Sequence, residues 1–155
     1  MLKKLAALGA AVAVAWALAT APANAASMTY RHLENYANTN ECLDYRADYG
    51  PYTTTCNQGP YQTWLMATDP ETAGELRQNV GNRLCLVARN GVPVMRTCVA
   101  GDKAALWTLH SVVGLGYQLV NKSTGTCLVA GSGSIHHVSL GVCSTGAARQ
   151  WYADI

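Results

Sequence analysis

A threefold internal repeat constrains this sequence more than any other feature. The repeated pattern is a Cys-Leu pair, a second cysteine and then a tryptophan, and its first copy runs from Cys42 through Cys56 to Trp64. The first cysteine recurs after 43 residues, at Cys85, and again after 42 residues, at Cys127. The tryptophan recurs after 43 and then 44 residues, at positions 107 and 151. A fixed period of this size predicts three structural units that share one core, at about residues 28–69, 70–112 and 113–155.

The first 25 residues have the pattern of a secretory signal peptide. Lys3 and Lys4 precede an uncharged apolar run over residues 5–19, and Ala23-Asn24-Ala25 forms a small-x-small cleavage site. The apolar run is shorter than the roughly 20 residues that a membrane-spanning helix needs, and no second run follows. We therefore expect residues 1–25 to be a signal peptide, residues 26–155 to form a single domain, and the product to be secreted without membrane insertion.

The charge balance argues against one class of partner. The sequence has 11 Lys and Arg residues against 9 Asp and Glu residues, and removal of Lys3 and Lys4 leaves 9 of each. A surface that binds nucleic acid needs clustered Lys and Arg to displace counterions from phosphates. The sequence contains no such cluster, so we expect no nucleic-acid partner.

The cysteine count predicts disulfide bonds. An even number of cysteines in an exported protein is usually paired, and this chain has 6. The spacing typical of zinc sites is absent, and adjacent His136 and His137 would point to opposite faces of a strand. We interpret these two histidines as part of a surface loop and expect neither metal nor cofactor. The repeat selects one pairing, within each unit: Cys42 with Cys56, Cys85 with Cys98, and Cys127 with Cys143.

The pattern of apolar residues indicates an all-β fold, because no segment has a sustained 3.6-residue period. Short β-prone runs are instead separated by Gly, Asn, Pro and Asp: Val92–Met95, Trp107–Val113, Tyr117–Val120 and Val138–Val142. One unit of about 43 residues cannot bury its own apolar face. The leucines and tryptophans that recur once per unit should therefore meet in a shared interior around a pseudo-threefold axis. Each unit opens with an apolar residue and an asparagine: Leu33 and Asn35, Leu76 and Asn79, Leu119 and Asn121.

The repeated motif carries a family resemblance. Cys-Leu-Asp, a second cysteine and Gln-x-Trp in threefold repetition resemble the ricin B-type lectin family over about residues 28–153. The resemblance implies a β-trefoil of twelve strands and a carbohydrate-binding protein without enzymatic activity. Within that family the first repeat is most similar to the actinohivin type, three-repeat lectins that recognise terminal mannose. The matching residues are Leu43-Asp44, Gly50, Tyr52-Thr53, Asn57-Gln58-Gly59 and Tyr61-Gln62-Thr63-Trp64.

The first repeat holds side chains suited to binding a sugar. A sugar offers vicinal hydroxyls to a carboxylate or amide, and an apolar face to an aromatic ring. Asp44 can accept hydrogen bonds from two hydroxyls, and Asn57 can both donate and accept. By resemblance, these two residues form a mannose pocket with Tyr52 and Tyr61, while Gln62 supports the pocket by holding Asp44 or the backbone. The alternative is that Asp44 caps a bend, and that Asn57 and the glycine after Gln58 form the next turn.

The second and third repeats lack this polar set. They keep the cysteines, leucines and tryptophans, so we predict one sugar site per chain. Thr54 stands where ricin B-type sites often place an aromatic ring, which favours a mannose-type over a galactose-type glycan as the partner. The substitutions are Val87 and Val129 for Asp44, Val94 and Ser139 for Tyr52, Val99 and Ser144 for Asn57, and Ala105 and Arg149 for Gln62.

A second hypothesis is a secreted β-trefoil that binds a protein partner, as an inhibitor or a toxin-delivery subunit, and retains only a vestigial sugar site. This hypothesis predicts an exposed apolar patch over Val87, Val94 and Val99, where polar groups were lost. An enzyme is the least supported class, because nothing places the carboxyls of Asp44 and Asp48 at the separation that a glycosidase needs. The sequence leaves the oligomeric state open.

Overall fold

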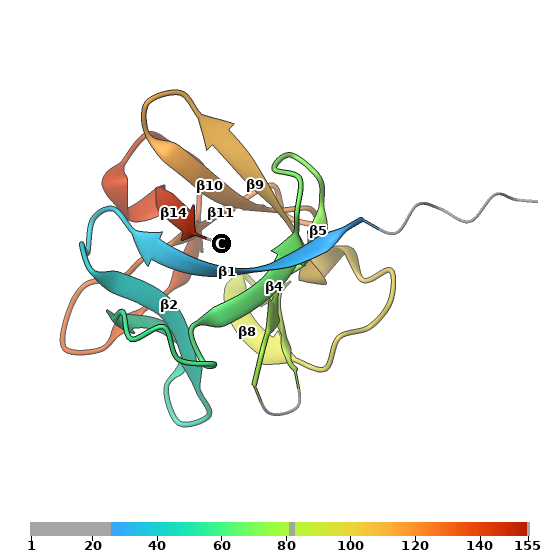
Figure 1. Cartoon of the computed structure of the whole chain (residues 1–155), viewed down its shortest axis with the longest axis horizontal. Helices are drawn as coiled ribbons and strands as arrows, with labels where there is room; N and C mark the ends of the chain where they lie inside the picture. Colours follow the sequence, from blue (N-terminus) through green and yellow to red (C-terminus); the bar gives the residue numbers. More distant parts are fainter. Residues whose placement is uncertain (1–25, 81–82, 155) are drawn as a thin grey trace, which may run out of the picture.

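The computed structural model describes residues 26–80 and 83–154, so the predicted signal peptide lies outside the described residues. The chain forms an all-β fold whose three repeats surround the centre of the molecule (Figure 1). Single helical turns, η1 (Lys103–Ala105) and η2 (Ala147–Arg149), precede the last strands of the second and third repeats. The strands are β1 (Met28–Asn35), β2 (Glu41–Arg46), β3 (Gly50–Thr55), β4 (Thr63–Ala67), β5 (Gly74–Glu75), β6 (Arg77–Gln78), β7 (Cys85–Arg89), β8 (Val92–Arg96), β9 (Leu106–Val112), β10 (Gly116–Asn121), β11 (Cys127–Val129), β12 (His136–His137), β13 (Ser139–Gly141) and β14 (Trp151–Asp154).

The strands follow the predicted β-trefoil plan of four per repeat, with two of them interrupted. Leu76 separates β5, which pairs with β9, from β6, which pairs with β4 and β7. Val138 separates β12, which pairs with β3, from β13, which pairs with β11. Each interruption falls where the chain changes its pairing partner. The described residues therefore contain 14 strands where the sequence predicted twelve.

The central hairpins of the three repeats share one register. Asp44 on β2 lies opposite Tyr52 on β3, and the equivalent pairs are Val87 with Val94 and Val129 with Ser139. The shared register agrees with the predicted equivalence of Val87 and Val129 with Asp44, and of Val94 and Ser139 with Tyr52. The three hairpins therefore place different side chains at the same position, so each repeat is an internal control for the others.

The shared core contains the residues that recur in every repeat. Three leucines that open the repeats and three tryptophans that close them are almost fully buried in one cluster. Each indole also donates a hydrogen bond to the carbonyl oxygen of the leucine in its own Cys-Leu pair, because a buried N–H needs a partner. These bonds are Trp64 Nε1 to Leu43 O at 2.9 Å, Trp107 Nε1 to Leu86 O at 2.8 Å and Trp151 Nε1 to Leu128 O at 3.2 Å.

One residue of the opening motif was wrongly assigned from the sequence. Gln78, rather than Asn79, is the buried counterpart of Asn35 and Asn121. The amide of Asn121 donates to the carbonyl oxygens of Ala104 and Leu106, and Gln78 Nε2 donates to Tyr61 O at 2.6 Å. A buried amide in each repeat thus ties its first strand to the segment before the tryptophan of the preceding repeat.

All six cysteines form the three predicted disulfides, one in each repeat. Cys42 is bonded to Cys56, Cys85 to Cys98, and Cys127 to Cys143, with sequence separations of 14, 13 and 16 residues. Each bridge joins the start of a central hairpin to the loop that leaves it. The bridges therefore fix the two ends of each hairpin in the unfolded as well as the folded chain.

Replacement of both Cys85 and Cys98 by alanine should lower the free energy of unfolding by about 3 kcal/mol, because the loop loses its cross-link in the unfolded state. Chemical denaturation of the oxidised proteins measures this loss. The second repeat contains none of the predicted sugar-binding residues, so binding at the first repeat should remain while the variant is folded. A loss below about 0.5 kcal/mol would contradict a stabilising role for this disulfide.

Candidate functional site

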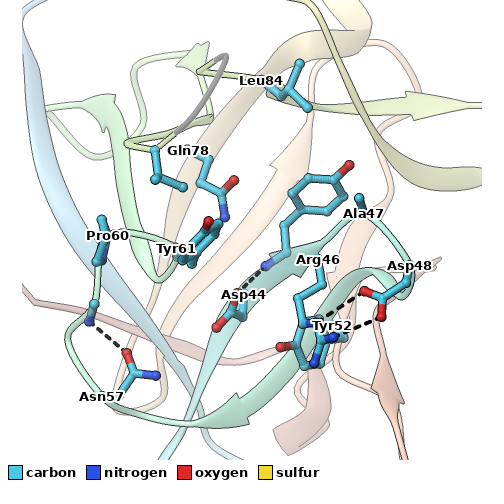
Figure 2. A pocket seen from close by; sticks show the side chains of 13 residues that line it. Asp44, Arg46, Ala47, Asp48, Tyr52, Asn57, Pro60, Tyr61, Gln78 and Leu84 are labelled. Atoms are coloured by element: carbon cyan, nitrogen blue, oxygen red, sulfur yellow. Dashed lines mark hydrogen bonds and ion pairs between the residues drawn. The ribbon is translucent and has the colours of Figure 1, made fainter.

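A groove of about 860 Å³ lies on the first repeat. It lies between the β2–β3 hairpin, the loop over residues 57–61 and the β6–β7 hairpin of the second repeat. Figure 2 shows Asp44 in the middle of this groove, with Asn57 and Leu84 on different sides of it. The groove contains four of the five predicted site residues, Asp44, Tyr52, Asn57 and Tyr61. The remaining lining residues are Tyr45, Arg46, Ala47, Asp48, Gly59, Pro60, Gln78, Val80 and Leu84.

Asp44 is held in a fixed orientation at the base of the groove. Its side chain is only 5% exposed. Oδ1 accepts a hydrogen bond from the backbone N–H of Tyr45 at 2.6 Å, and Oδ2 accepts one from Gln62 Nε2 at 3.1 Å. A carboxylate offers about four acceptor positions. Each oxygen of Asp44 therefore keeps one further position for a ligand.

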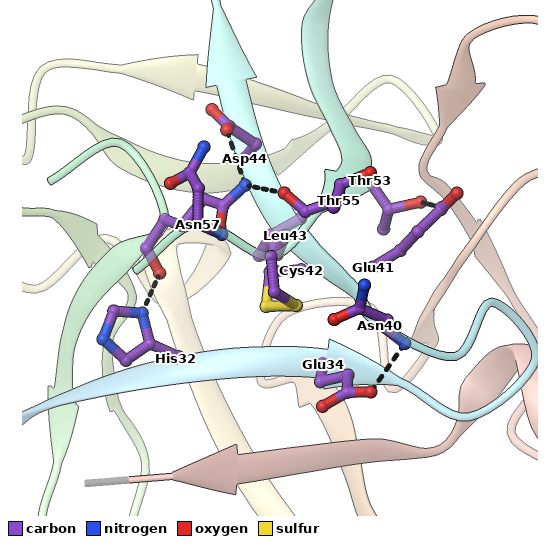
Figure 3. Close-up of a disulfide and its surroundings, with 12 residues drawn as sticks. His32, Glu34, Asn40, Glu41, Cys42, Leu43, Asp44, Thr53, Thr55 and Asn57 are labelled. Carbon is purple, nitrogen blue, oxygen red and sulfur yellow. Dashed lines mark hydrogen bonds between the residues drawn. A yellow bond between two sulfur atoms is a disulfide. The ribbon is translucent and has the colours of Figure 1, made fainter. Parts of the chain in front are cut away.

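Gln62 occupies the supporting position that the sequence predicted for it. Its side chain is fully buried, and its Nε2 also donates to the carbonyl oxygen of Thr55 at 3.0 Å. Its Oε1 accepts from the backbone N–H of Asn57 at 2.8 Å. Figure 3 shows the bonds to Asp44 and Thr55 beside the Cys42–Cys56 disulfide. One amide therefore fixes Asp44 and the loop that carries Asn57 relative to each other.

Asn57 has the turn-forming role that the alternative interpretation gave it. Its Oδ1 accepts a hydrogen bond from the backbone N–H of Gly59 at 2.7 Å. A side chain on Gly59 would place its Cβ 2.7 Å from the same Oδ1, so it would have to displace the Asn57 side chain from this turn. The turn uses only the oxygen of the Asn57 side chain. The side chain is exposed and lines the groove, so its NH₂ group can still donate to a ligand.

The two predicted tyrosines differ in their surroundings. Tyr61 is 53% exposed and offers its ring to solvent in the groove. Tyr52 is almost buried, and its ring meets that of Tyr49 edge-on with centroids 5.5 Å apart. The guanidinium of Arg46 lies 4.4 Å from the centroid of Tyr49 and pairs with Asp48. Tyr52 therefore forms a supported wall of the groove, while Tyr61 is the ring available for stacking.

Burial and its neighbours shift the acidity of Asp44 in opposite directions. Burial raises the pKa of this carboxyl above the ordinary value of 3.8, because the charged form loses hydration. The hydrogen bonds from Gln62 and the Tyr45 backbone and the charge of Arg46 lower the pKa, but burial has the larger effect. Burial also raises the pKa of Tyr52, and the negative charge of Asp44 adds to that shift.

The equivalent positions of the other repeats have a different character. Val87 is 1% exposed and packs in a small buried cluster of the second repeat. Val99 is 60% exposed, and the exposure of Val94 lies between these two values. The three valines therefore do not form the exposed apolar patch that the protein-binding hypothesis predicted. Val87 and Val94 are cross-strand partners in the β7–β8 hairpin, and Val99 lies in the loop after β8.

The prediction that His136 and His137 lie in a surface loop was wrong. These residues form strand β12 and pair with Thr53 and Tyr52 of β3. His136 Nδ1 lies 2.6 Å from Glu41 Oε2, so the histidine joins the third repeat to the first. In residues 26–80 and 83–154, the one group of three potential metal ligands detected is Glu75, Cys85 and Cys98, and its two sulfurs form a disulfide.

Seven residues of the groove were not assigned to it from the sequence. Tyr45 adjoins the motif residue Asp44, and its aromatic character was a usable signal. Arg46 and the second-repeat residues belong to the groove through packing between elements, which the repeat pattern of one unit does not encode. These residues are Tyr45, Arg46, Ala47, Pro60, Gln78, Val80 and Leu84. No helix within the described part of the chain is long and apolar enough to cross a membrane.

Comparisons with solved structures agree on the fold. A designed threefold-symmetric protein, ThreeFoil, superposes with a TM-score of 0.71 at 16% identity, covering 81% of this chain and 98% of that one. A mosquitocidal holotoxin gives a TM-score of 0.71 at 16% identity, and the match covers 85% of this chain but 18% of the toxin. Polyporus squamosus lectin, bound to Neu5Aca2-6Galb1-4GlcNAc, gives 0.66 at 14% identity over 80% of this chain and 48% of the lectin. No curated protein sequence matches the chain.

The fold and groove together define a disulfide-bonded β-trefoil with a polar groove on its first repeat. The family model described as ricin-type beta-trefoil lectin domain matches residues 29–152. The chain belongs to this family. The family binds glycans and its domains are generally non-enzymatic, so membership supports carbohydrate binding by this protein.

Proposed function

We propose that this protein is a secreted lectin that binds mannose-type glycans at the Asp44 groove and has no enzymatic activity. The observation that carries the proposal is the Asp44 carboxylate, which the fully buried Gln62 fixes at the base of an open groove. The second and third repeats keep the same hairpin register but have valine at this position. The polar arrangement is therefore not required by the fold, and a ligand explains its presence in one repeat.

The groove offers the groups that a neutral sugar needs. Each oxygen of Asp44 can accept a hydrogen bond from one of two adjacent hydroxyls, and such charge-assisted bonds are stronger than neutral ones. Asn57 can donate its NH₂ group to a ring or hydroxyl oxygen. The half-exposed ring of Tyr61 can cover the C–H face of the sugar. The preference for mannose rests on the resemblance of the first repeat to the actinohivin type and on the lack of an aromatic ring at Thr54.

A single site implies weak binding to a free sugar. Linked sites can raise avidity by about 10² to 10⁴, and this chain has one predicted site. We expect a Kd of roughly millimolar to high micromolar for a monosaccharide glycoside. Calorimetric titration with methyl α-mannoside and methyl β-galactoside tests the proposal. Saturable binding of the mannoside, with the galactoside weaker, is expected; a stronger galactoside would overturn the mannose assignment, and no binding of either would overturn the lectin proposal.

The affinity for the mannoside should fall on acidification, with a midpoint above pH 3.8. Burial raises the pKa of Asp44 above that value, and the protonated carboxyl loses the charge that strengthens its bonds to hydroxyls. Binding should thus be complete above the raised pKa and lost below it. The folded protein also holds this proton more tightly than the unfolded chain, so the contribution of Asp44 to stability decreases as the pH rises from 3.8 through its raised pKa.

Titrations from about pH 3.5 to pH 7 measure this midpoint. The variant Asp48→Asn is a suitable control, because it removes the other carboxyl in the groove and should leave the midpoint above pH 3.8. A wild-type midpoint at or below pH 3.8 would show that Asp44 is not the group that controls binding.

A further inference from the structure

The groove extends beyond the polar site onto the second repeat. Its volume of about 860 Å³ falls within the roughly 300–1,000 Å³ of pockets that hold drug-sized ligands, so it has room for more than one sugar ring. Asp44 and Asn57 lie in the part formed by the first repeat. The opposite part is formed by Val80 and Leu84, which stand at the two ends of the β6–β7 connection.

The backbone holds these two apolar residues in place. The N–H of Gln78 donates to the carbonyl oxygen of Leu84 at 2.9 Å, and the N–H of Arg83 donates to that of Val80 at 3.2 Å. Gln78 also donates its side-chain Nε2 to Tyr61 O, which joins this hairpin to the loop that carries the exposed ring. The apolar part of the groove therefore lies in the connection between two paired strands, β6 and β7, and is linked directly to the polar part.

The other repeats show that the fold does not require apolar residues at these two positions. The residue before the first cysteine is Leu84 in the second repeat but Glu41 and Thr126 in the others. Val80, two residues after Gln78, corresponds to Ala37 and Ser123, which follow Asn35 and Asn121 by the same interval.

The apolar pair thus occurs only at the repeat boundary that faces an Asp44-type site. Under the pseudo-threefold relation, Ser123 and Thr126 face the second-repeat position occupied by Val87, and the hairpin of Glu41 faces the third-repeat position occupied by Val129. Both side chains are partly buried, and Leu84 also packs against the shared core. The apolar surface that they leave open to water in the groove is unfavourable by about 25 cal/mol per Å² relative to buried surface. The apolar pair and the polar Asp44 site occur together at one repeat boundary, which indicates that one ligand contacts both.

We propose that the groove recognises a glycoside that carries an apolar aglycone, with the sugar on Asp44 and Asn57 and the aglycone on Val80 and Leu84. This inference rests on the proposed lectin function. The groove contains the acidic Asp44 and Asp48 and the basic Arg46, and Arg46 is paired with Asp48. The unpaired charge is that of Asp44, so an uncharged sugar with an uncharged aglycone is the chemistry that fits.

Calorimetric titration with methyl α-mannoside, phenyl α-mannoside and an α-linked dimannoside tests this inference on the wild type and on Val80→Thr and Leu84→Asn. The two variants make the apolar wall polar with little change in size. Val142→Thr, at an exposed valine outside the groove, is the matched control. Thermal melts of each variant confirm folding, and Val80→Thr remains informative if Leu84→Asn is unstable. The phenyl glycoside should bind the wild type about fivefold or more tightly than the methyl glycoside.

The expected advantage should fall to less than about twofold in Val80→Thr and Leu84→Asn and persist in Val142→Thr. Equal affinities in the wild type would overturn the inference while leaving the lectin proposal intact. An advantage that survives both groove substitutions would place the aglycone elsewhere and also overturn it. The dimannoside could also bind more tightly than the methyl glycoside by the same factor as the phenyl glycoside, and lose this advantage in Val80→Thr and Leu84→Asn. That result would overturn the inference that the aglycone is apolar. No binding of any glycoside would overturn the lectin proposal and this inference together.

Discussion

Replacement of Asp44 by alanine is expected to weaken mannoside binding by at least about tenfold, below detection for a millimolar site. The variant loses two charge-assisted hydrogen bonds to the sugar, and bonds to charged groups contribute roughly 1.5–3 kcal/mol each, where 1.4 kcal/mol is a factor of ten. Gln62 keeps its bonds to Thr55 O and to the Asn57 backbone, so the loop around the groove should stay in place. Calorimetric titration of both proteins at neutral pH measures the difference.

Asp154→Asn is the matched control for this experiment. Asp154 is exposed on β14 and does not line the groove, so its loss of charge should leave the affinity unchanged. A thermal melt of the Asp44 variant establishes that it is folded. Undiminished binding by a folded Asp44→Ala protein would show that the sugar binds at another place.

Replacement of Trp107 by alanine is expected to lower the free energy of unfolding by about 3–5 kcal/mol, the usual cost of removing a fully buried tryptophan. The substitution empties part of the shared core and removes the donor to Leu86 O. A buried carbonyl without a partner adds to the loss. Equilibrium unfolding in urea, followed by the fluorescence of the remaining tryptophans, measures the change.

Trp107→Phe refines this test because it keeps an aromatic ring and loses the indole N–H. Its destabilisation should be smaller than that of the alanine variant. Trp107 belongs to the second repeat and lies outside the groove, so mannoside affinity should persist in the folded phenylalanine variant. A destabilisation below about 1 kcal/mol for Trp107→Ala would contradict its role in the shared core.

The repeat pattern was sufficient to predict the scaffold. Cysteine, leucine and tryptophan recur at one period because the same packing position recurs three times, and so the pairing of Cys42 with Cys56 and the burial of Trp64 followed from spacing alone. The equivalence of positions between repeats followed in the same way, since Asp44 and Tyr52 stand at equal intervals from cysteines shared by all repeats. The family resemblance also predicted that Gln62 would hold Asp44 or the backbone, and its amide bonds to both.

Features that depend on contacts between repeats were not predictable in this way. Leu84 and Val80 belong to the groove because the second repeat packs beside the first, and neither residue stands out within its own repeat. His136 forms a strand because β3 of the first repeat provides a pairing partner. Gln78 was missed because its buried position is filled by asparagine in the other repeats, and the neighbouring Asn79 matched that pattern instead.

The most direct test of a single first-repeat sugar site is an amide chemical-shift titration of the mature, oxidised protein with methyl α-mannoside. We expect saturable shifts concentrated at Asp44, Asn57 and Tyr61, with one binding event per chain and no comparable change at Val87 or Val129. Shifts centred on the second or third repeat would contradict the account. The absence of any saturable shift in the folded protein would contradict it as well.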